Sequence, residues 1–243
     1  MTKLRIRITA ANPVVVVLIG GWQYRWVSDD AYIDFRVVHN ILQGLGPVFN
    51  PGERLEVYTD PLWVGVLTAF SGLFSFLSVE WWSVILGLLF TGFGFWLEGL
   101  ATTSLASKHC DRPVLPLGIL CVSVVAGVWM FATSGLETGL IFGWLGLSSW
   151  LLVRAFQNNG NGVFIAGIIL SLGFTIRPDM ALFTLSEGVT LFILLLRRGQ
   201  GRSPVGAKRI IGLLVALTGI PILSELFRIA YFGQGSAFGG DFG

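Results

Sequence analysis

Long apolar runs separated by short polar segments dominate this sequence. A helix that crosses a membrane needs about 20 mainly apolar residues. This criterion predicts candidate membrane segments at 10–27, 61–79, 82–106, 113–132, 138–154, 162–176, 179–196 and 210–228. We therefore expect an all-α, multi-pass membrane protein, with a helical transmembrane domain over 1–232 and a disordered glycine-rich tail at 233–243.

The longest polar stretch between these runs, 28–60, is predicted to have a structure of its own. Near its start, apolar residues recur at helical spacing, at Ile33, Val37, Val38, Ile41 and Leu42. This spacing predicts an amphipathic helix on the membrane surface that ends near Gly44. Asp29 and Asp30 would lie at its start, where carboxylates are favoured as caps and by the helix dipole. Two adjacent acids are more than one cap requires.

Charge supports a membrane location and suggests an orientation. Charged residues make up only 12% of the chain, whereas soluble domains carry about 25%. Basic residues cluster at 3–7 and 197–209, and such clusters beside membrane spans stay in the cytoplasm. The loop 28–60 would then face outward from the plasma membrane. These clusters are far from the dense basic patch that nucleic-acid binding requires, so we expect no nucleic-acid partner.

The crossing count leaves two topologies open. Passing from an outward Asp60 to an inward Lys108 takes an odd number of crossings, yet two apolar runs lie between them. Either the short, glycine-interrupted segment 61–79 is re-entrant or surface-lying, or Lys108, offset by Asp111, faces outward.

Polar groups at the ends of apolar runs are the candidates for chemistry. Three of them fall on the outer side in the predicted topology: Asp29-Asp30, the turn 133–138 with Glu137, and Arg177-Pro178-Asp179. Ionisable residues at membrane depth are costly and often functional, so we expect one composite site. An arginine can bind a phosphate through two hydrogen bonds, and a carboxylate can deprotonate an acceptor hydroxyl. This set suits transfer of a group from a lipid phosphate.

Structural roles compete with these functional ones. Arg177 could end a span and extend toward the interface, and Glu137 could cap a helix. The Asp29-Asp30 pair could bind a divalent cation through oxygen ligands. We predict neither a cofactor nor a metal site, because no His or Cys has partners at the spacing of metal ligands.

Tryptophans gather near the ends of the apolar runs, at Trp22, Trp26, Trp63, Trp81 and Trp82. Indole favours the headgroup region of a bilayer, so most of them are expected to be interfacial anchors. Those near the outer loop could instead stack on a sugar.

The outer loop also carries a resemblance to a known family. Residues 29–36 read DDAYIDFR, and residues 44–63 read GLGPVFNPGERLEVYTDPLW. Both resemble the first outer loop of polytopic GT-C glycosyltransferases, in particular the terminal β-(1→2) arabinofuranosyltransferases of actinobacterial cell walls. The segments SGLET at 134–138 and RPD at 177–179 are similar to later motifs of that family.

This resemblance implies a GT-C-like helical bundle and inverting transfer of arabinofuranose. The donor would be a polyprenylphosphoryl arabinose, decaprenylphosphoryl arabinose in that family, and the acceptor would be cell-wall arabinan outside the membrane. On the matching positions, Asp29 or Asp30 would be the catalytic base. Arg177 is the candidate for binding the donor phosphate, because it is an isolated charge that ends an apolar run. The implied substrate contacts are Arg36, Tyr58, Thr59, Glu137 and Asp179.

Two alternative functions remain open. Family members are longer, and Asp60 stands where a small polar residue is expected, so the chain could be an inactive remnant of such an enzyme. A transporter or flippase for a lipid-linked sugar would place its acids within spans. Here the acids lie mainly in a loop, which favours transfer at the membrane surface.

Overall fold

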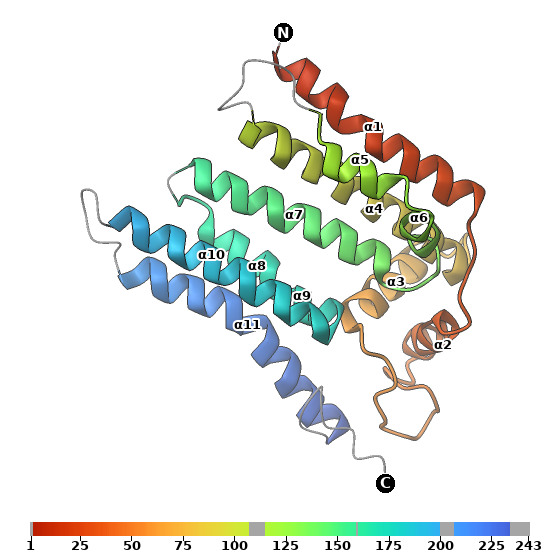
Figure 1. Cartoon of the computed structure of the whole chain (residues 1–243). Helices are drawn as coiled ribbons and strands as arrows, with labels where there is room; N and C mark the ends of the chain where they lie inside the picture. Colours follow the sequence, from red (N-terminus) through yellow and green to blue (C-terminus); the bar gives the residue numbers. More distant parts are fainter. Residues whose placement is uncertain (1, 107–114, 159, 200–206, 234–243) are drawn as a thin grey trace. The chain divides into compact units, whose positions relative to one another are not determined.

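The computed structural model describes residues 2–106, 115–158, 160–199 and 207–233 (Figure 1). Side chains are described for 13–106, 115–158, 160–196 and 209–233. Within these ranges the regular structure is entirely helical, which confirms the predicted all-α class. The predicted tail beyond Gly233, the loop around Lys108 and most of the two basic clusters lie outside the side chains described.

The chain forms two compact units, each described by itself. Unit 1 comprises residues 1–31 and 74–154, and unit 2 comprises residues 32–73 and 155–243. The single domain expected over 1–232 stays a prediction.

Unit 1 is built around the long helices of the N-terminal half. Its helices are α1 (Thr2–Gln23), α4 (Val79–Ala106), α5 (Leu117–Ser123), α6 (Ala126–Phe131) and α7 (Thr138–Gln157) up to Arg154. Helix α1 runs along α4 and also contacts α5 and α6 (Figure 1). A Cβ at Gly94 of α4 would overlap the carbonyl oxygen of Phe142, and one at Gly146 of α7 would overlap that of Gly94. Glycines therefore allow α4 and α7 the close approach that is typical of membrane helices.

Unit 2 contains the outer-loop helices and the C-terminal helices. They are α2 (Ala31–Leu42) from Tyr32 on, α3 (Pro61–Leu73), α8 (Val163–Ser171), α9 (Gly173–Ile176), η1 (Pro178–Met180), α10 (Ala181–Gly199) and α11 (Ala207–Phe232). Helix α8 packs against α10 and α11, which run beside each other (Figure 1). A Cβ at Gly167 of α8 would meet the side chains of Ala216 and Leu213 of α11, so a small residue is needed at this contact.

Four helices of the described residues are long and apolar enough to cross a membrane. They are Val79–Ala106, Thr138–Gln157, Pro178–Leu196 and Arg209–Phe232. These match the predicted segments 82–106, 138–154, 179–196 and 210–228, and they confirm a multi-pass membrane protein.

The other predicted segments are shorter or broken. Helix α3 has 13 residues, or about 20 Å at 1.5 Å per residue, less than the roughly 30 Å of a bilayer core. Helices α8 and α9 are joined by the single residue Leu172, which keeps helical dihedral angles, and together they form an apolar helix over Val163–Ile176 that is shorter than a span. The described part of 113–132 forms the two short helices α5 and α6. They separate at Val124 and Val125, where Val125 has an extended backbone (φ −74°, ψ 117°).

The predicted amphipathic helix is confirmed as α2. It ends at Leu42, and Gly44 follows with φ +76°, a backbone conformation that favours glycine. Val37 and Val38 are buried, whereas Ile33 remains partly exposed. The helical spacing was therefore interpreted correctly, although the buried face also includes the polar side chains of Asp34 and Asn40. Its position on a membrane surface stays a prediction.

Candidate functional site

In unit 1, the Asp29-Asp30 pair lies beside the turn at 133–138. After α1 ends at Gln23, the chain is non-helical until a turn at Asp29 and Asp30, whose side chains are exposed. The backbone N–H of Ser28 donates to the carbonyl oxygen of Ser134 at 2.7 Å. The structure therefore brings together two motifs that are more than a hundred residues apart in sequence.

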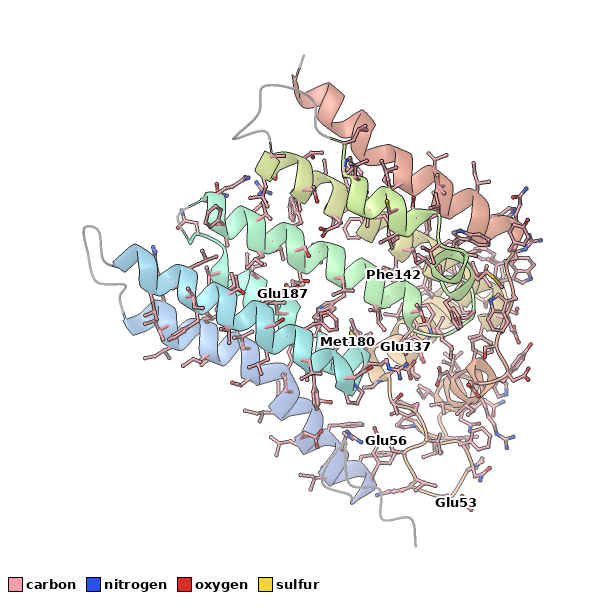
Figure 2. All side chains as sticks on the ribbon, in the orientation of Figure 1. Glu53, Glu56, Glu137, Phe142, Met180 and Glu187 are labelled. Atoms are coloured by element: carbon pink, nitrogen blue, oxygen red, sulfur yellow. The ribbon has the colours of Figure 1, made fainter. Side chains whose placement is uncertain are left out.

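The turn at 133–138 is a buried polar segment that leads into α7. Ser134 is fully buried, and its hydroxyl donates to the carbonyl oxygen of Phe131 at 2.8 Å. Gly135 has φ +87°, which permits the reversal of the chain. Glu137 is buried at the start of α7, where its carbonyl oxygen accepts the N–H of Ile141 (Figure 2). A carboxylate is favoured by the dipole at this helix end, so a capping role for Glu137 fits its position.

In unit 2, Arg177 lies in a short break between helices. Helix α9 ends at Ile176, Arg177 is extended (φ −158°), and Pro178 begins η1. The Nε of Arg177 is 3.1 Å from Oδ1 of Asp179, and the two side chains are 46% and 58% exposed. The predicted phosphate ligand is therefore an accessible guanidinium that already holds one carboxylate.

An apolar groove lies between α10 and α11. Its volume is about 480 Å³, and its lining includes Phe174, Ala181, Gly188, Leu217 and Pro221. Phe174 and Ala181 stand on either side of Arg177 in the sequence. The groove therefore begins on the segments that flank the arginine.

Arg36 and Thr59 occupy the surface of the outer loop. The Nε–H of Arg36 donates to the carbonyl oxygen of Phe49 at 3.0 Å, and its guanidinium lies 4.5 Å from the centre of the Phe49 ring. The side-chain amide of Asn40 donates to the carbonyl oxygens of Val48 and Phe49. These contacts hold the turn after α2 against the helix, and they give Arg36 a structural role. Thr59 is exposed.

Tyr58 belongs to a buried cluster that the sequence analysis missed. Glu56, Tyr58 and Asp60 alternate along the segment before α3, and Tyr58 and Asp60 are buried. Oε2 of Glu56 accepts from Nε and Nη2 of Arg228 of α11 at 2.7 and 2.6 Å (Figure 2). Arg228 also pairs with Glu225 at 3.2 Å. The charged residues Glu225 and Arg228 near the end of an apolar run, and the acids Glu56 and Asp60, were the available signals.

Burial sets the proton affinities in this cluster. It raises the pKa of the Glu56 carboxyl above its ordinary value, and the guanidinium of Arg228 only partly offsets this effect. Burial, together with the nearby Glu56 and Asp60 carboxyls, also raises the pKa of Tyr58 well above its ordinary range. Tyr58 is therefore a neutral hydrogen-bonding group at physiological pH, not a base.

The predicted site residues divide between the two units. Asp29, Asp30 and Glu137 belong to unit 1, and Arg36, Tyr58, Thr59, Arg177 and Asp179 belong to unit 2. The composite site and its outward orientation therefore stay predictions. Across the ranges that the structure describes, no group of three or more His, Cys, Asp or Glu side chains is arranged to hold a metal ion.

Comparison with known proteins relates the chain to one kind of enzyme. No family model matches it, and no solved structure does. It is 31% identical to a terminal β-(1→2)-arabinofuranosyltransferase of Mycobacterium tuberculosis, over 95% of this chain and 37% of that protein. It is 32% identical to the enzyme of the same name from Corynebacterium glutamicum, over 96% of this chain and 35% of that protein. The chain thus spans little more than a third of the length of these relatives, and it is a partial homologue of terminal β-(1→2)-arabinofuranosyltransferases.

Proposed function

We propose that the chain acts in a membrane glycosyltransferase that moves a pentose, arabinofuranose, from a polyprenyl-phosphate donor to cell-wall arabinan at the outer face of the plasma membrane. The observation that carries this proposal is the similarity to arabinofuranosyltransferases along nearly the whole chain. The candidate membrane spans support a lipid-linked donor, because such a donor resides in the bilayer.

The proposed base is Asp29 or Asp30. A phosphate leaves with little help, but the acceptor hydroxyl must lose its proton as it attacks the sugar. A positioned carboxylate typically accelerates such a step by about 10² to 10⁴-fold. Both aspartates are exposed, and the bond from Ser28 to Ser134 fixes the backbone next to them. Side chains of adjacent residues diverge, so we expect only one of them to face the acceptor.

Arg177 is the proposed ligand of the donor phosphate. Its guanidinium is exposed, and its pairing with Asp179 is of the exposed kind that contributes little stability. A phosphate can therefore replace or join this carboxylate through two parallel hydrogen bonds. The apolar groove between α10 and α11 begins beside Arg177 in the sequence, which supports it as a site for part of the polyprenyl chain.

The decisive experiment gives the purified chain a labelled polyprenylphosphoryl arabinose and an arabinan oligosaccharide. Release of polyprenyl phosphate together with sugar transfer would support the enzyme. Movement of intact donor across vesicles without transfer would instead identify a transporter. Absence of both activities would favour the remnant.

Variants of the aspartate pair test the mechanism in the same assay. Asparagine keeps the shape and capping ability of aspartate but cannot accept a proton. We expect one of Asp29→Asn and Asp30→Asn to lose nearly all transfer and the other to lose less. Glu53→Gln, which changes an exposed acid of the same loop, is the matched control and should transfer at the parent rate. If both asparagine variants also keep that rate, the base must be sought at Asp34, Glu137 or Asp179.

A further inference from the structure

The tryptophans of the chain differ in what surrounds their rings. The buried ones are Trp63, Trp82 and Trp144. An arginine lies over the rings of several others, with Arg25 near Trp22 and Trp81, and Arg154 near Trp150. Trp96 lies within the candidate span α4, and Trp129 lies against Tyr24, with ring centres 5.1 Å apart. Trp26 stands apart from all of these.

The polar edge of Trp26 is used within the protein. Its Nε1–H donates to the carbonyl oxygen of Met130 at 3.0 Å, although the residue is 39% exposed. An interfacial anchor is expected to direct its N–H toward water and headgroups, keeping its apolar body in the lipid. In Trp26 the N–H is directed inward to the backbone, so the exposed part of this side chain is aromatic surface.

Phe131 extends this surface. Its ring meets that of Trp26 edge-on, with centres 6.0 Å apart and planes at 75°, and Phe131 is also exposed. The bond to Met130 fixes the indole, and Phe131 ends helix α6. The two rings therefore form a preorganised aromatic surface at one edge of unit 1.

We propose that the Trp26–Phe131 surface binds a neutral sugar ring of the acceptor glycan by stacking. This inference rests on the proposed function and deepens it. The negative face of an aromatic ring attracts the partly positive C–H groups of a sugar, and a neutral ring loses no charge solvation on binding. Asp29 and Asp30 follow closely in the sequence and oppose an anionic occupant, whereas the guanidinium of the adjacent Arg25 lies over the rings of Trp22 and Trp81 and donates to the carbonyl oxygen of Trp22.

The spacing along the chain suits a subsite next to the proposed base. Asp29 is three positions after Trp26 in the sequence, and three extended residues reach at most about 11 Å. Ser28 lies between them and is held by Ser134. A sugar unit stacked on Trp26 would therefore lie close to the acceptor sugar unit whose hydroxyl gives its proton to the base.

The test is binding of an arabinan oligosaccharide to the full chain in detergent, without donor, measured by isothermal titration calorimetry. We expect Trp26→Ala to weaken binding about tenfold and Phe131→Leu to weaken it less. Trp26→Phe keeps a ring without the N–H and should retain most of the affinity. Trp22→Ala removes another exposed tryptophan of unit 1 and is the matched control, with binding unchanged.

Several outcomes would overturn the inference. They are unchanged binding by Trp26→Ala, an equal loss in Trp22→Ala, and no measurable binding by the parent protein. If Trp26→Ala does not fold, the comparison of Trp26→Phe with Trp26→Leu decides, because only the phenylalanine variant should bind. Donor is absent, so a loss of binding can be observed even if sugar transfer fails. Conversely, transfer by Trp26→Ala with the parent KM for the acceptor would refute the subsite and leave the proposed function intact.

Discussion

Two arginine–carboxylate pairs of unit 2 differ in their exposure to solvent and in the sequence separation of their partners. Arg177 and Asp179 are two residues apart, 3.1 Å from each other, and about half exposed. Arg228 and Glu56 are 172 residues apart, as close as 2.6 Å, and only 19% and 10% exposed. The exposed pair joins neighbours in one short segment, whereas the buried pair joins the outer loop to helix α11.

This difference separates a residue that can bind a ligand from one that holds the fold. Exposed ion pairs contribute about 0–1 kcal/mol, so Arg177 can exchange its partner for a phosphate at little cost. Removing one member of a buried pair leaves an uncompensated charge and is strongly destabilising. We therefore assign ligand binding to Arg177 and positioning of the outer loop to Arg228.

The largest effect should come from breaking the buried pair. Arg228→Met leaves Glu56 without its main partner and is expected to lower the free energy of unfolding by about 2 kcal/mol, less than for a fully buried pair, because the two side chains keep some exposure to solvent. Unfolding of the purified protein in detergent, followed by heating or by denaturant, measures this loss. Adding Glu56→Gln should recover much of the stability, because of the two carboxylates that pair with Arg228 only that of the more exposed Glu225 then remains. A double variant no more stable than Arg228→Met would show that Arg228 acts through packing alone.

The second effect concerns use of the donor. Arg177→Lys keeps the charge but loses the geometry for two parallel hydrogen bonds, so we expect about a tenfold fall in kcat/KM for the donor. Thermal stability should match the parent, which excludes misfolding as the cause. Asp179→Asn removes the carboxylate of this pair and is the companion variant, expected to retain donor use. Equal kcat/KM in the lysine variant would indicate that Arg177 is only a charge at the end of a span.

The sequence shows where the two arginines lie along the chain, but it does not show which of them is more buried in the folded protein. Both arginines follow apolar residues, and Arg177 was selected because it is an isolated charge that ends an apolar run. The partner of Arg228 is distant in sequence, and only the folded chain shows that Glu56 reaches it. Likewise, the sequence placed Ser28 and Ser134 at the same predicted face, but their hydrogen bond depends on tertiary packing.

The sequence predicted the fold correctly where the length and the hydropathy of a segment gave the same answer. Over 82–106 and 210–228, length and hydropathy agree, and long helices form there. Over 113–132 hydropathy alone suggested one span, whereas the chain leaves the helix where the backbone of Val125 becomes extended, which hydropathy does not encode. Asn40 illustrates a further limit, because its hydrogen bonds to the loop make a polar residue part of the buried face of α2.

A third, smaller effect is the pH dependence of the buried pair. Burial raises the pKa of Glu56 above its ordinary value of 4.5, so between these two pKa values the folded state keeps a proton that the unfolded state has already lost. The stability from this group is therefore complete below about pH 4.5 and is lost as pH rises through the raised pKa. Unfolding measured from pH 4 to 8 should show this slope in the parent and not in Glu56→Gln. Identical profiles for the two proteins would contradict the assignment.

The smallest effect should be the coupling between Arg177 and Asp179. A double-mutant cycle with Arg177→Met and Asp179→Asn isolates the interaction from the separate effects of each change. Because both side chains are about half exposed, water and salt screen the pair, and we expect a coupling of about 0.5 kcal/mol in unfolding that weakens as salt is added. The same cycle on Arg228 and Glu56 should give a clearly larger coupling with less dependence on salt. If the exposed pair proved as strong as the buried one, Arg177 would be committed to Asp179, and binding a phosphate would require breaking a stable contact. Its assignment as the donor ligand would then have to be abandoned.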